Sequence, residues 1–197
     1  MSISLVYDGY GNRKYLDQSE RRAFLAAAEA APPEVKTFCL VLAYTGARIS
    51  EVLALTPGRI DFNANVIVFE SLKKRRRGHY RAVPIPKDII HTLDTTHGVM
   101  SAQSSARTST ELLWPWCRTT AWARVKEVMR RAQIYGVQAS PKGLRHSLGV
   151  TALQKGVPLN IIQKWLGHSH LHTTAIYSDA MGPEEQQFAA QLWQGFE

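Results

Sequence analysis

Hydrophobic side chains recur along most of the chain at the spacing of a helix. Asp17 and Glu20 have the spacing of a capping box, and an alanine-rich stretch over residues 21–31 follows them. Residues 35–42 then place apolar side chains on one stripe, and Gly46 is suited to end that segment. The pattern therefore predicts two helices at the start of the chain.

Later segments repeat this pattern. We expect further helices over residues 50–55, 87–93, 119–133, 142–154, 159–166 and 186–193. Ser140 and Pro141 supply a side-chain cap and a first-turn proline for the fourth of these. In the third, Trp122, Val125 and Met129 fall on one face.

The periodicity changes in two short segments. Residues 66–69 and 80–85 are rich in β-branched and aromatic side chains, and they predict a pair of strands joined by a basic connection. Residues 1–14 and 99–110 are polar, so we expect a flexible N-terminal arm and a mobile internal segment. The predicted fold class is mainly α (α+β): one helical domain over residues 15–197 with a small antiparallel sheet or hairpin.

The charge balance adds a possible partner. Lysine and arginine total 24 against 16 acidic residues, which gives a net charge of +8 and a pI near 9.7. Such a surface favours a polyanion, because each phosphate that a cation neutralises releases a condensed counterion. Charge alone leaves open a basic surface that serves only solubility.

Cysteine usage and hydropathy exclude several classes. The two cysteines form no CxxC pair, and Cys39 lies in an apolar run, so neither a disulfide framework nor a cysteine zinc site is indicated. The first residues lack the basic start and apolar stretch of a signal peptide. No run approaches the ~18 apolar residues of a membrane span. We therefore expect a cytoplasmic protein with no membrane partner.

Polar residues beside apolar helices are the candidates for chemistry. Arg48 lies between Gly46 and a new helix, where unpaired backbone N–H groups favour an anion. Arg145 follows Lys142 by three residues, so both share one helix face. His168 follows a helix end, nine residues before Tyr177. Taken singly, each could instead be a surface or packing residue.

Taken together, three segments carry a family resemblance. The sequences LAYTGARISEVLAL, SPKGLRHSLGVTAL and WLGHSHLHTTAIYSD stand in this order along the chain. They resemble the tyrosine recombinase (phage integrase) family, and the likeness covers residues 15–177. The resemblance implies a helical catalytic domain with a β-hairpin. It implies that Arg48, Arg145 and His168 bind the DNA phosphate and that Tyr177 is the nucleophile.

The basic segment over residues 71–79 resembles the family's hairpin. That likeness implies a catalytic lysine, for which Lys73 is preferred to Lys74. We expect Lys74, Arg75, Arg76 and Arg77 to contact DNA, because they belong to a run of five consecutive cations; the alternative is a solvated hairpin tip.

The second box departs from the family. The family usually has His-x-x-Arg, whereas this chain has Lys142 three residues before Arg145. A lysine can still donate to a phosphate oxygen, but its unperturbed pKa of ~10.4 rules out a neutral base near pH 7. We assign Lys142 an electrostatic role, and we expect Glu51 to orient an arginine from behind the site.

The resemblance implies a site-specific recombinase or integrase of a mobile genetic element. Such an enzyme cleaves and rejoins double-stranded DNA through a covalent 3′-phosphotyrosine, with no metal and no cofactor. For the helix expected over residues 186–193, the resemblance implies packing on a neighbouring copy and a homo-oligomer on DNA, although the helix could equally fold back on its own domain. We also expect that the chain has no N-terminal core-binding domain.

Three alternatives stay open. Without an N-terminal core-binding domain and with Lys142 in the second box, the chain could be a DNA-binding accessory protein that does not cleave. A type IB topoisomerase-like activity would use a similar set of residues. The alternation of His168, His170 and His172 suggests zinc, but no carboxylate or cysteine joins them at ligand spacing.

Overall fold

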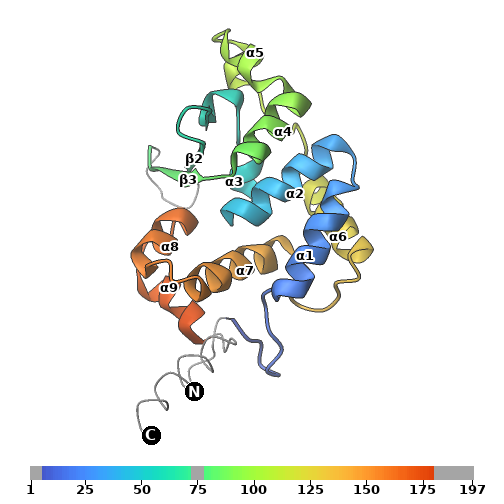
Figure 1. Ribbon diagram of the computed structural model, residues 1–197, viewed down its shortest axis with the longest axis vertical. Helices are drawn as coiled ribbons and strands as arrows, with labels where there is room; N and C mark the ends of the chain where they lie inside the picture. The colour runs from blue at the N-terminus through green and yellow to red at the C-terminus, as the bar shows by residue number, and fades with distance from the viewer. Residues whose placement is uncertain (1–5, 72–77, 180–197) are drawn as a thin grey trace, which may run out of the picture.

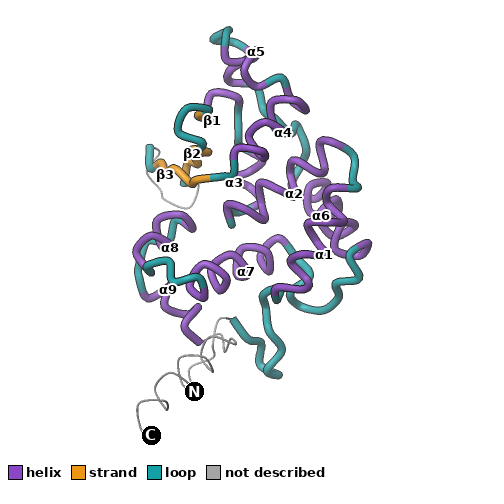
Figure 2. Tube along the Cα trace, viewed as in Figure 1, coloured by secondary structure: helices purple, strands orange, loops and turns teal. Residues whose placement is uncertain are grey.

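Helices make up most of the fold, with a small sheet on one side (Figures 1 and 2). The computed structural model describes residues 6–71 and 78–179. The helices are α1 (Gln18–Glu29), α2 (Pro33–Thr45), α3 (Ile49–Leu53), α4 (Lys87–His97), α5 (Val99–Gln103), α6 (Arg118–Arg131), α7 (Pro141–Gln154), α8 (Leu159–Leu166) and α9 (His172–Ala175). Three 3-10 turns are η1 (Pro57–Arg59), η2 (Thr108–Thr110) and η3 (Ile176–Asp179).

The sheet is antiparallel, with β1 (Ile60–Asp61), β2 (Val66–Glu70) and β3 (Tyr80–Pro84) side by side in that order. The mainly helical fold class with one small antiparallel sheet is thus confirmed. Strand β2 contacts α3, and β3 contacts α8. The sheet therefore lies against the two helices next to Arg48 and His168.

Helix α2 is the centre of the larger core. Phe38, Cys39 and Val41 are fully buried, and they point to different sides of the helix. The expectation of a single buried stripe on α2 was therefore wrong. The reason is that α1, α4 and α7 all pack against it, and a helix covered on several sides is apolar all round.

Local caps fix where two of the helices begin. The Asp17 carboxylate accepts from the Glu20 backbone N–H at 2.8 Å, and the Glu20 carboxylate accepts from the Asp17 N–H at 3.0 Å. The Ser140 hydroxyl accepts from the Gly143 N–H at 3.1 Å, with Pro141 at the first position of α7. Both predicted caps are confirmed, and α7 carries the second candidate arginine.

Residues 99–110 are more regular than expected. They contain α5 and η2, and the Gln103 amide donates to the carbonyls of Pro57 and Ile60 at 2.7 and 2.8 Å. The prediction of a mobile segment there was wrong. Serine and threonine hydroxyls can donate hydrogen bonds to nearby backbone carbonyls, so a polar segment need not be a loop. The Thr108 hydroxyl does so by donating to the Ala102 carbonyl at 2.6 Å.

The predicted shared face of α6 (Arg118–Arg131) is only partly buried. On α6, Val125 and Met129 are buried, but Trp122 is 48% exposed. Trp122 lines the mouth of the cavity described below, and the Lys126 ammonium lies 5.7 Å from its ring centroid. On this face of α6, Val125 and Met129 therefore pack in the core, whereas Trp122 lines the cavity.

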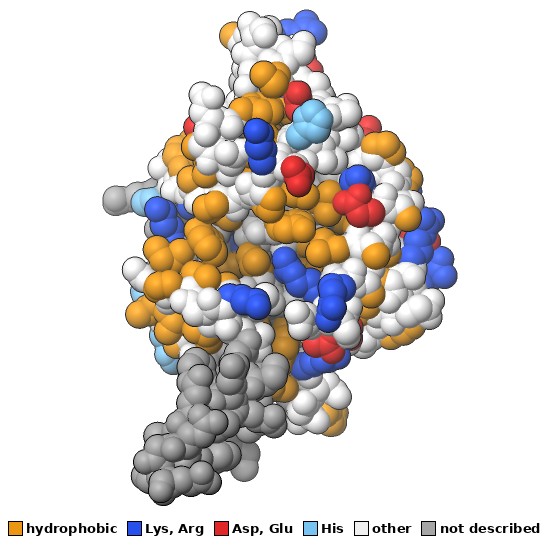
Figure 3. All heavy atoms as spheres, viewed as in Figure 1, with side chains coloured by type: hydrophobic (Ala, Val, Ile, Leu, Met, Phe, Trp, Pro, Cys, Tyr) orange, Lys and Arg blue, Asp and Glu red, His pale blue; other side chains and the backbone are white. Residues whose placement is uncertain are grey.

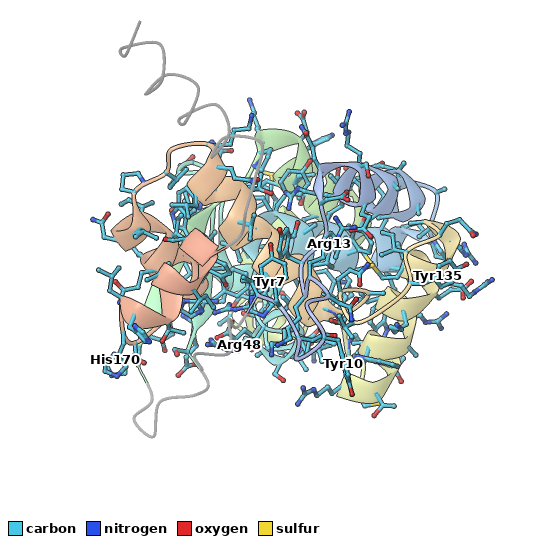
Figure 4. The ribbon with its side chains drawn as sticks, turned by 90° about the horizontal axis from the view of Figure 1, so that it is seen from below. Tyr7, Tyr10, Arg13, Arg48, Tyr135 and His170 are labelled. Carbon is cyan, nitrogen blue, oxygen red and sulfur yellow. The ribbon has the colours of Figure 1, made fainter. Side chains whose placement is uncertain are left out.

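The described part of the N-terminal arm makes defined contacts. Val6 is fully buried, Tyr7 pairs with Arg13 in an antiparallel bridge, and the Lys14 N–H donates to the Val6 carbonyl at 2.7 Å (Figure 4). Residues 6–14 therefore form a turn against the core rather than the loose arm that their polarity predicts. The predicted helix over residues 186–193 lies outside the described residues.

No helix within the described ranges is long and apolar enough to cross a membrane. On the face drawn in Figure 3, lysine and arginine side chains are scattered among hydrophobic and acidic ones.

Candidate active site

The candidate residues meet at one cavity of about 770 Å³. Arg48, Lys142, Arg145 and His168 all line it, although they come from three segments far apart in the sequence. Trp122 and Arg118 of α6 line it as well. The cavity thus combines several cations with an aromatic ring, a lining suited to a phosphate and its neighbouring sugar or base.

Arg48 is placed by the tight junction between α2 and α3. Gly46 ends α2 in the left-handed conformation at φ 59°, where a Cβ atom would also lie 2.7 Å from Leu166 Cδ2. Arg48 then has extended backbone at the start of α3. Figure 4 shows Arg48 near the middle of the molecule, viewed from below. The expected position between a glycine stop and a new helix is confirmed.

Glu51 lies behind Arg48 and is buried, with 3% of its surface exposed. Its carboxylate accepts from the Arg48 guanidinium at 2.9 Å and from the Arg48 backbone N–H at 2.8 Å. Burial alone raises the pKa of Glu51, but hydrogen bonds from Arg81 and the charges of Arg81 and Arg48 bring it below its ordinary value. The carboxylate is therefore ionised and holds Arg48 in place.

Arg81 was missed by the sequence reasoning. It is buried on β3, donates to both Glu51 oxygens at 3.3 and 2.7 Å, and donates through Nε to the Trp165 carbonyl at 2.8 Å. Its guanidinium also lies 5.0 Å from the Phe69 ring centroid. A usable signal was present: Arg81 occupies an inward-facing strand position two residues before the buried Val83. A cation there needs a buried partner.

Arg145 joins two of the segments directly. Its guanidinium donates to the Gly46 carbonyl at 2.7 Å and to the Leu166 carbonyl at 2.6 Å. Burial and the charge of the nearby Arg48 lower the pKa of Arg145 to about 10. It stays protonated at neutral pH, so it brings a desolvated positive charge to the cavity wall.

His168 follows Gly167, the left-handed residue that ends α8. Its Nδ1 atom lies 2.9 Å from the Thr174 hydroxyl oxygen. Burial and the charges of Arg145 and Arg48 lower the pKa of His168 to about 3, so the ring is neutral at pH 7. If Nδ1 accepts from Thr174, Nε2 carries the ring proton and can donate to a phosphate oxygen.

Tyr177 lies beside the cavity rather than in it. Its ring stacks on His168 with centroids 6.2 Å apart, and only 1% of the residue is exposed. Burial raises the pKa of Tyr177 to about 12, against the lowering effect of Arg145 and Arg48. The structure therefore brings Tyr177 next to His168 but withdraws its hydroxyl from solvent, which the sequence did not predict.

The remaining candidates lie at the edge of the site or beyond it. Lys142 is exposed on the rim of the cavity, one turn before Arg145 on α7. The proposed acid Lys73 and the proposed DNA contacts fall outside the described residues; these contacts are Lys74, Arg75, Arg76 and Arg77. For these residues the assignments remain predictions.

The alternating histidines do not form a cluster. His170 is exposed, and Figure 4 shows it at the outer edge of the molecule, pointing away from Arg48. Over residues 6–71 and 78–179, no group of three or more His, Cys, Asp or Glu side chains is arranged to hold a metal ion.

Solved structures share this arrangement of elements. The chain superposes on the crystal structure of XerA recombinase with a TM-score of 0.71 at 22% identity, over 90% of this chain and 62% of that one. It superposes on the catalytic domain of bacteriophage HP1 integrase with a TM-score of 0.63 at 21% identity, over 84% of this chain and 86% of that one. The fold is that of tyrosine recombinase catalytic domains.

Sequence comparison identifies the family. The Phage integrase family model matches residues 14–182, so the chain belongs to the phage integrase family. The chain is 32% identical to tyrosine recombinase XerA of Pyrococcus furiosus over 71% of this chain and 48% of the relative. It is 31% identical to tyrosine recombinase XerD of Pseudomonas aeruginosa over 90% of this chain and 61% of the relative. It therefore spans about half to three fifths of these relatives' lengths.

Proposed function

We propose that this chain is the catalytic part of a site-specific DNA recombinase that cleaves and rejoins strands through a covalent 3′-phosphotyrosine at Tyr177. The observation that carries the proposal is the convergence of Arg48, Arg145 and His168 on one cavity, with the Tyr177 ring stacked on His168. Membership of the phage integrase family and the named tyrosine recombinases among its relatives support the same activity.

The two arginines supply the charge that phosphoryl transfer requires. A guanidinium can hold two non-bridging phosphate oxygens, and in a water-poor cavity it stabilises the charge that develops there. Arg145 is fixed by two backbone carbonyls and Arg48 by Glu51, so neither has to reorganise as the reaction proceeds. His168 would donate a further hydrogen bond to the same phosphate.

Tyr177 has to move before it can react. A free tyrosine is only about 0.1% ionised at pH 7, and burial makes this hydroxyl still less acidic. Binding of DNA in the cavity would draw the hydroxyl toward the scissile phosphate and its cations. Attack would release a 5′-hydroxyl, with Lys73 protonating the leaving oxygen, and a second strand's 5′-hydroxyl would reverse the step.

The proposed partner is double-stranded DNA, contacted by the cavity and by the basic hairpin. We further propose assembly of several copies on DNA through the C-terminal segment over residues 186–193, which lies outside the described residues. An enzyme of this kind would act on DNA in the cytoplasm.

Nicked duplexes tiled across the flanks of the gene test the activity. A protein–DNA adduct on denaturing gels that forms with the wild type and not with Tyr177→Phe supports cleavage. Salt-sensitive DNA binding without any adduct would instead favour the accessory protein that does not cleave.

A further inference from the structure

One pair of side chains holds buried polar atoms that have no partner. Within the described ranges, the buried side-chain nitrogen and oxygen atoms without a hydrogen-bond partner are Nδ1 and Nε2 of His146 and the hydroxyl oxygen of Tyr177. Buried polar groups in folded proteins are nearly always hydrogen-bonded, because leaving them unpaired is unfavourable. A pair of such groups in contact calls for a functional reason.

His146 contacts both the nucleophile and the cavity. It follows Arg145 on α7, is 7% exposed, and lines the cavity together with Arg48, Arg145 and His168. Its ring meets the Tyr177 ring edge-on, with centroids 5.9 Å apart and an interplanar angle of 63°. His146 therefore lies at the boundary between the buried position of Tyr177 and the proposed phosphate site.

His168, the second histidine beside Tyr177, already uses one ring nitrogen in a hydrogen bond. His168 Nδ1 pairs with the Thr174 hydroxyl, whereas both nitrogens of His146 are free. Lys142 occupies the position where the family usually has histidine, and its side chain offers no ring nitrogen to Tyr177. Among the side chains that touch Tyr177 and line the cavity, His146 has an uncommitted ring nitrogen able to accept a proton.

We propose that His146 is a catalytic residue of the cleavage reaction, accepting the hydroxyl proton of Tyr177 as that oxygen attacks the DNA phosphate. The inference rests on the function proposed above and adds a role for a residue outside the five that the resemblance assigns.

The O–H bond of Tyr177 breaks, its proton passes to a ring nitrogen of His146, and the phenolic oxygen forms a bond to phosphorus. The bond from phosphorus to the 5′-oxygen breaks, and that oxygen leaves with the electron pair and takes a proton from the hairpin lysine. Ligation runs the same transfers in reverse and returns the proton from His146 to Tyr177.

The charges around His146 suit this role. Burial and the cations Lys142, Arg145 and Lys14 lower the pKa of His146 to about 4, so the ring is neutral and able to accept at pH 7. A phosphodiester bound between Arg48 and Arg145 brings a negative charge beside those cations. That charge raises the pKa of His146 toward its ordinary value, so the base strengthens once substrate is in place.

The substitution His146→Phe distinguishes the role of the ring nitrogens from the packing of the ring. Phenylalanine keeps the edge-on packing against Tyr177 but accepts no proton, and it leaves no buried nitrogen unpaired. We therefore expect the variant to fold at least as stably as the wild type, since removing an unpaired buried polar group is favourable. His146→Asn serves as a second variant that keeps a hydrogen-bond acceptor without basicity. His97→Phe is the control for replacing a half-buried histidine away from the cavity; His97 packs on Trp114 and pairs with the Thr37 hydroxyl.

The measurement is single-turnover adduct formation on the duplex found by the nicked-DNA screen, from about pH 7 to about pH 9.5. We expect both His146 variants to bind DNA as the wild type does but to form adduct about 100-fold more slowly at pH 7. The deficit should shrink as pH rises, because hydroxide can then remove the tyrosine proton.

Two results would overturn the inference. One is adduct formation by His146→Phe within about threefold of the wild type and of His97→Phe. The other is a deficit that stays constant over the whole pH range, which would indicate a structural role. Absence of an adduct with the wild type would instead count against the proposed function.

Discussion

The ring of Tyr177 occupies space that exists only because residue 149 is glycine. A Cβ atom at Gly149 would lie 2.4 Å from Cε2 and Cζ of Tyr177, far inside the contact distance of two carbon atoms. Gly149 is in the middle of α7, where alanine would ordinarily favour the helix. The glycine therefore allows the Tyr177 ring to pack against the helix that carries Arg145.

Replacing Gly149 by alanine should push Tyr177 out of this position. We expect the free energy of unfolding to fall by about 1–3 kcal/mol, as in other overpacked cores, and Tyr177 to become accessible. Nitration of Tyr177, followed by peptide mass spectrometry, measures that accessibility. Gly9→Ala is the control, since its added Cβ meets no atom within 4 Å. Equal nitration of Tyr177 in all three proteins would contradict this account.

The buried Arg81–Glu51 pair should matter for stability. Arg81→Met leaves the Glu51 carboxylate with only Arg48, and removing one partner of a buried pair typically costs about 3–5 kcal/mol. Urea denaturation measures the loss. Adding Glu51→Leu to Arg81→Met should recover part of it, because the unpaired charge is then gone. In contrast, Arg130→Met breaks an exposed pair with Glu127 and should change the midpoint very little. Equal losses at Arg81 and Arg130 would argue against a structural role for the buried network.

Arg145 should not tolerate lysine. A single ammonium cannot span the Gly46 and Leu166 carbonyls as the guanidinium does. We expect Arg145→Lys to form adduct roughly 10²–10³-fold more slowly, the usual loss on removing one donor to the transition state. Arg22→Lys changes an exposed arginine that bonds only to its own helix, so it should cleave at the wild-type rate. A fully active Arg145→Lys would show that the two carbonyl contacts do not matter.

Acid should destabilise the domain in a defined range of pH. The folded-state pKa values of His146 and His168, about 4 and about 3, lie below the ordinary value of 6.5, so the unfolded chain takes up protons first. Above about pH 6.5 the two histidines do not change the free energy of unfolding. As pH falls from there toward their folded-state pKa values, the free energy of unfolding declines. Glu51 affects stability at lower pH. Its stabilising contribution is present above pH 4.5 and is lost as pH falls through its lowered folded-state pKa.

Urea denaturation at a series of pH values measures this decline. His146→Phe should remove up to about 1 kcal/mol per pH unit from the slope between pH 6.5 and 4. A wild-type curve that is level across this range would contradict the buried, neutral state of both histidines.

Features that depend on neighbours in the chain were predicted well. Asp17 and Ser140 cap their helices, and Gly46 ends α2, because each effect involves residues within one turn. The two predicted strands also pair, although their exact ends and the short β1 were missed. Such ends depend on the partner strand, which local propensity does not describe.

Features that depend on distant segments were not predicted. Arg81 acquires its role from Glu51 and Trp165, which are 30 and 84 residues away in the sequence. The burial of Tyr177 depends on Gly149 and His146, and no local pattern around Tyr177 indicates it. The structure places Arg48, Arg145, His168 and Tyr177 close together, as the family resemblance implied, but the resemblance carried no information on the buried position of Tyr177.

The polarity and attachment point of the covalent adduct test the central claim most directly. A cleaved duplex labelled at its 5′ end should leave that label on the protein, whereas a 3′-end label should be released on a fragment with a free 5′-hydroxyl. After trypsin digestion, the nucleotide should be found on the peptide following Lys164, in which Tyr177 is the only tyrosine. A label retained from the 3′ end, or an adduct that maps to another peptide, would contradict Tyr177 as the nucleophile.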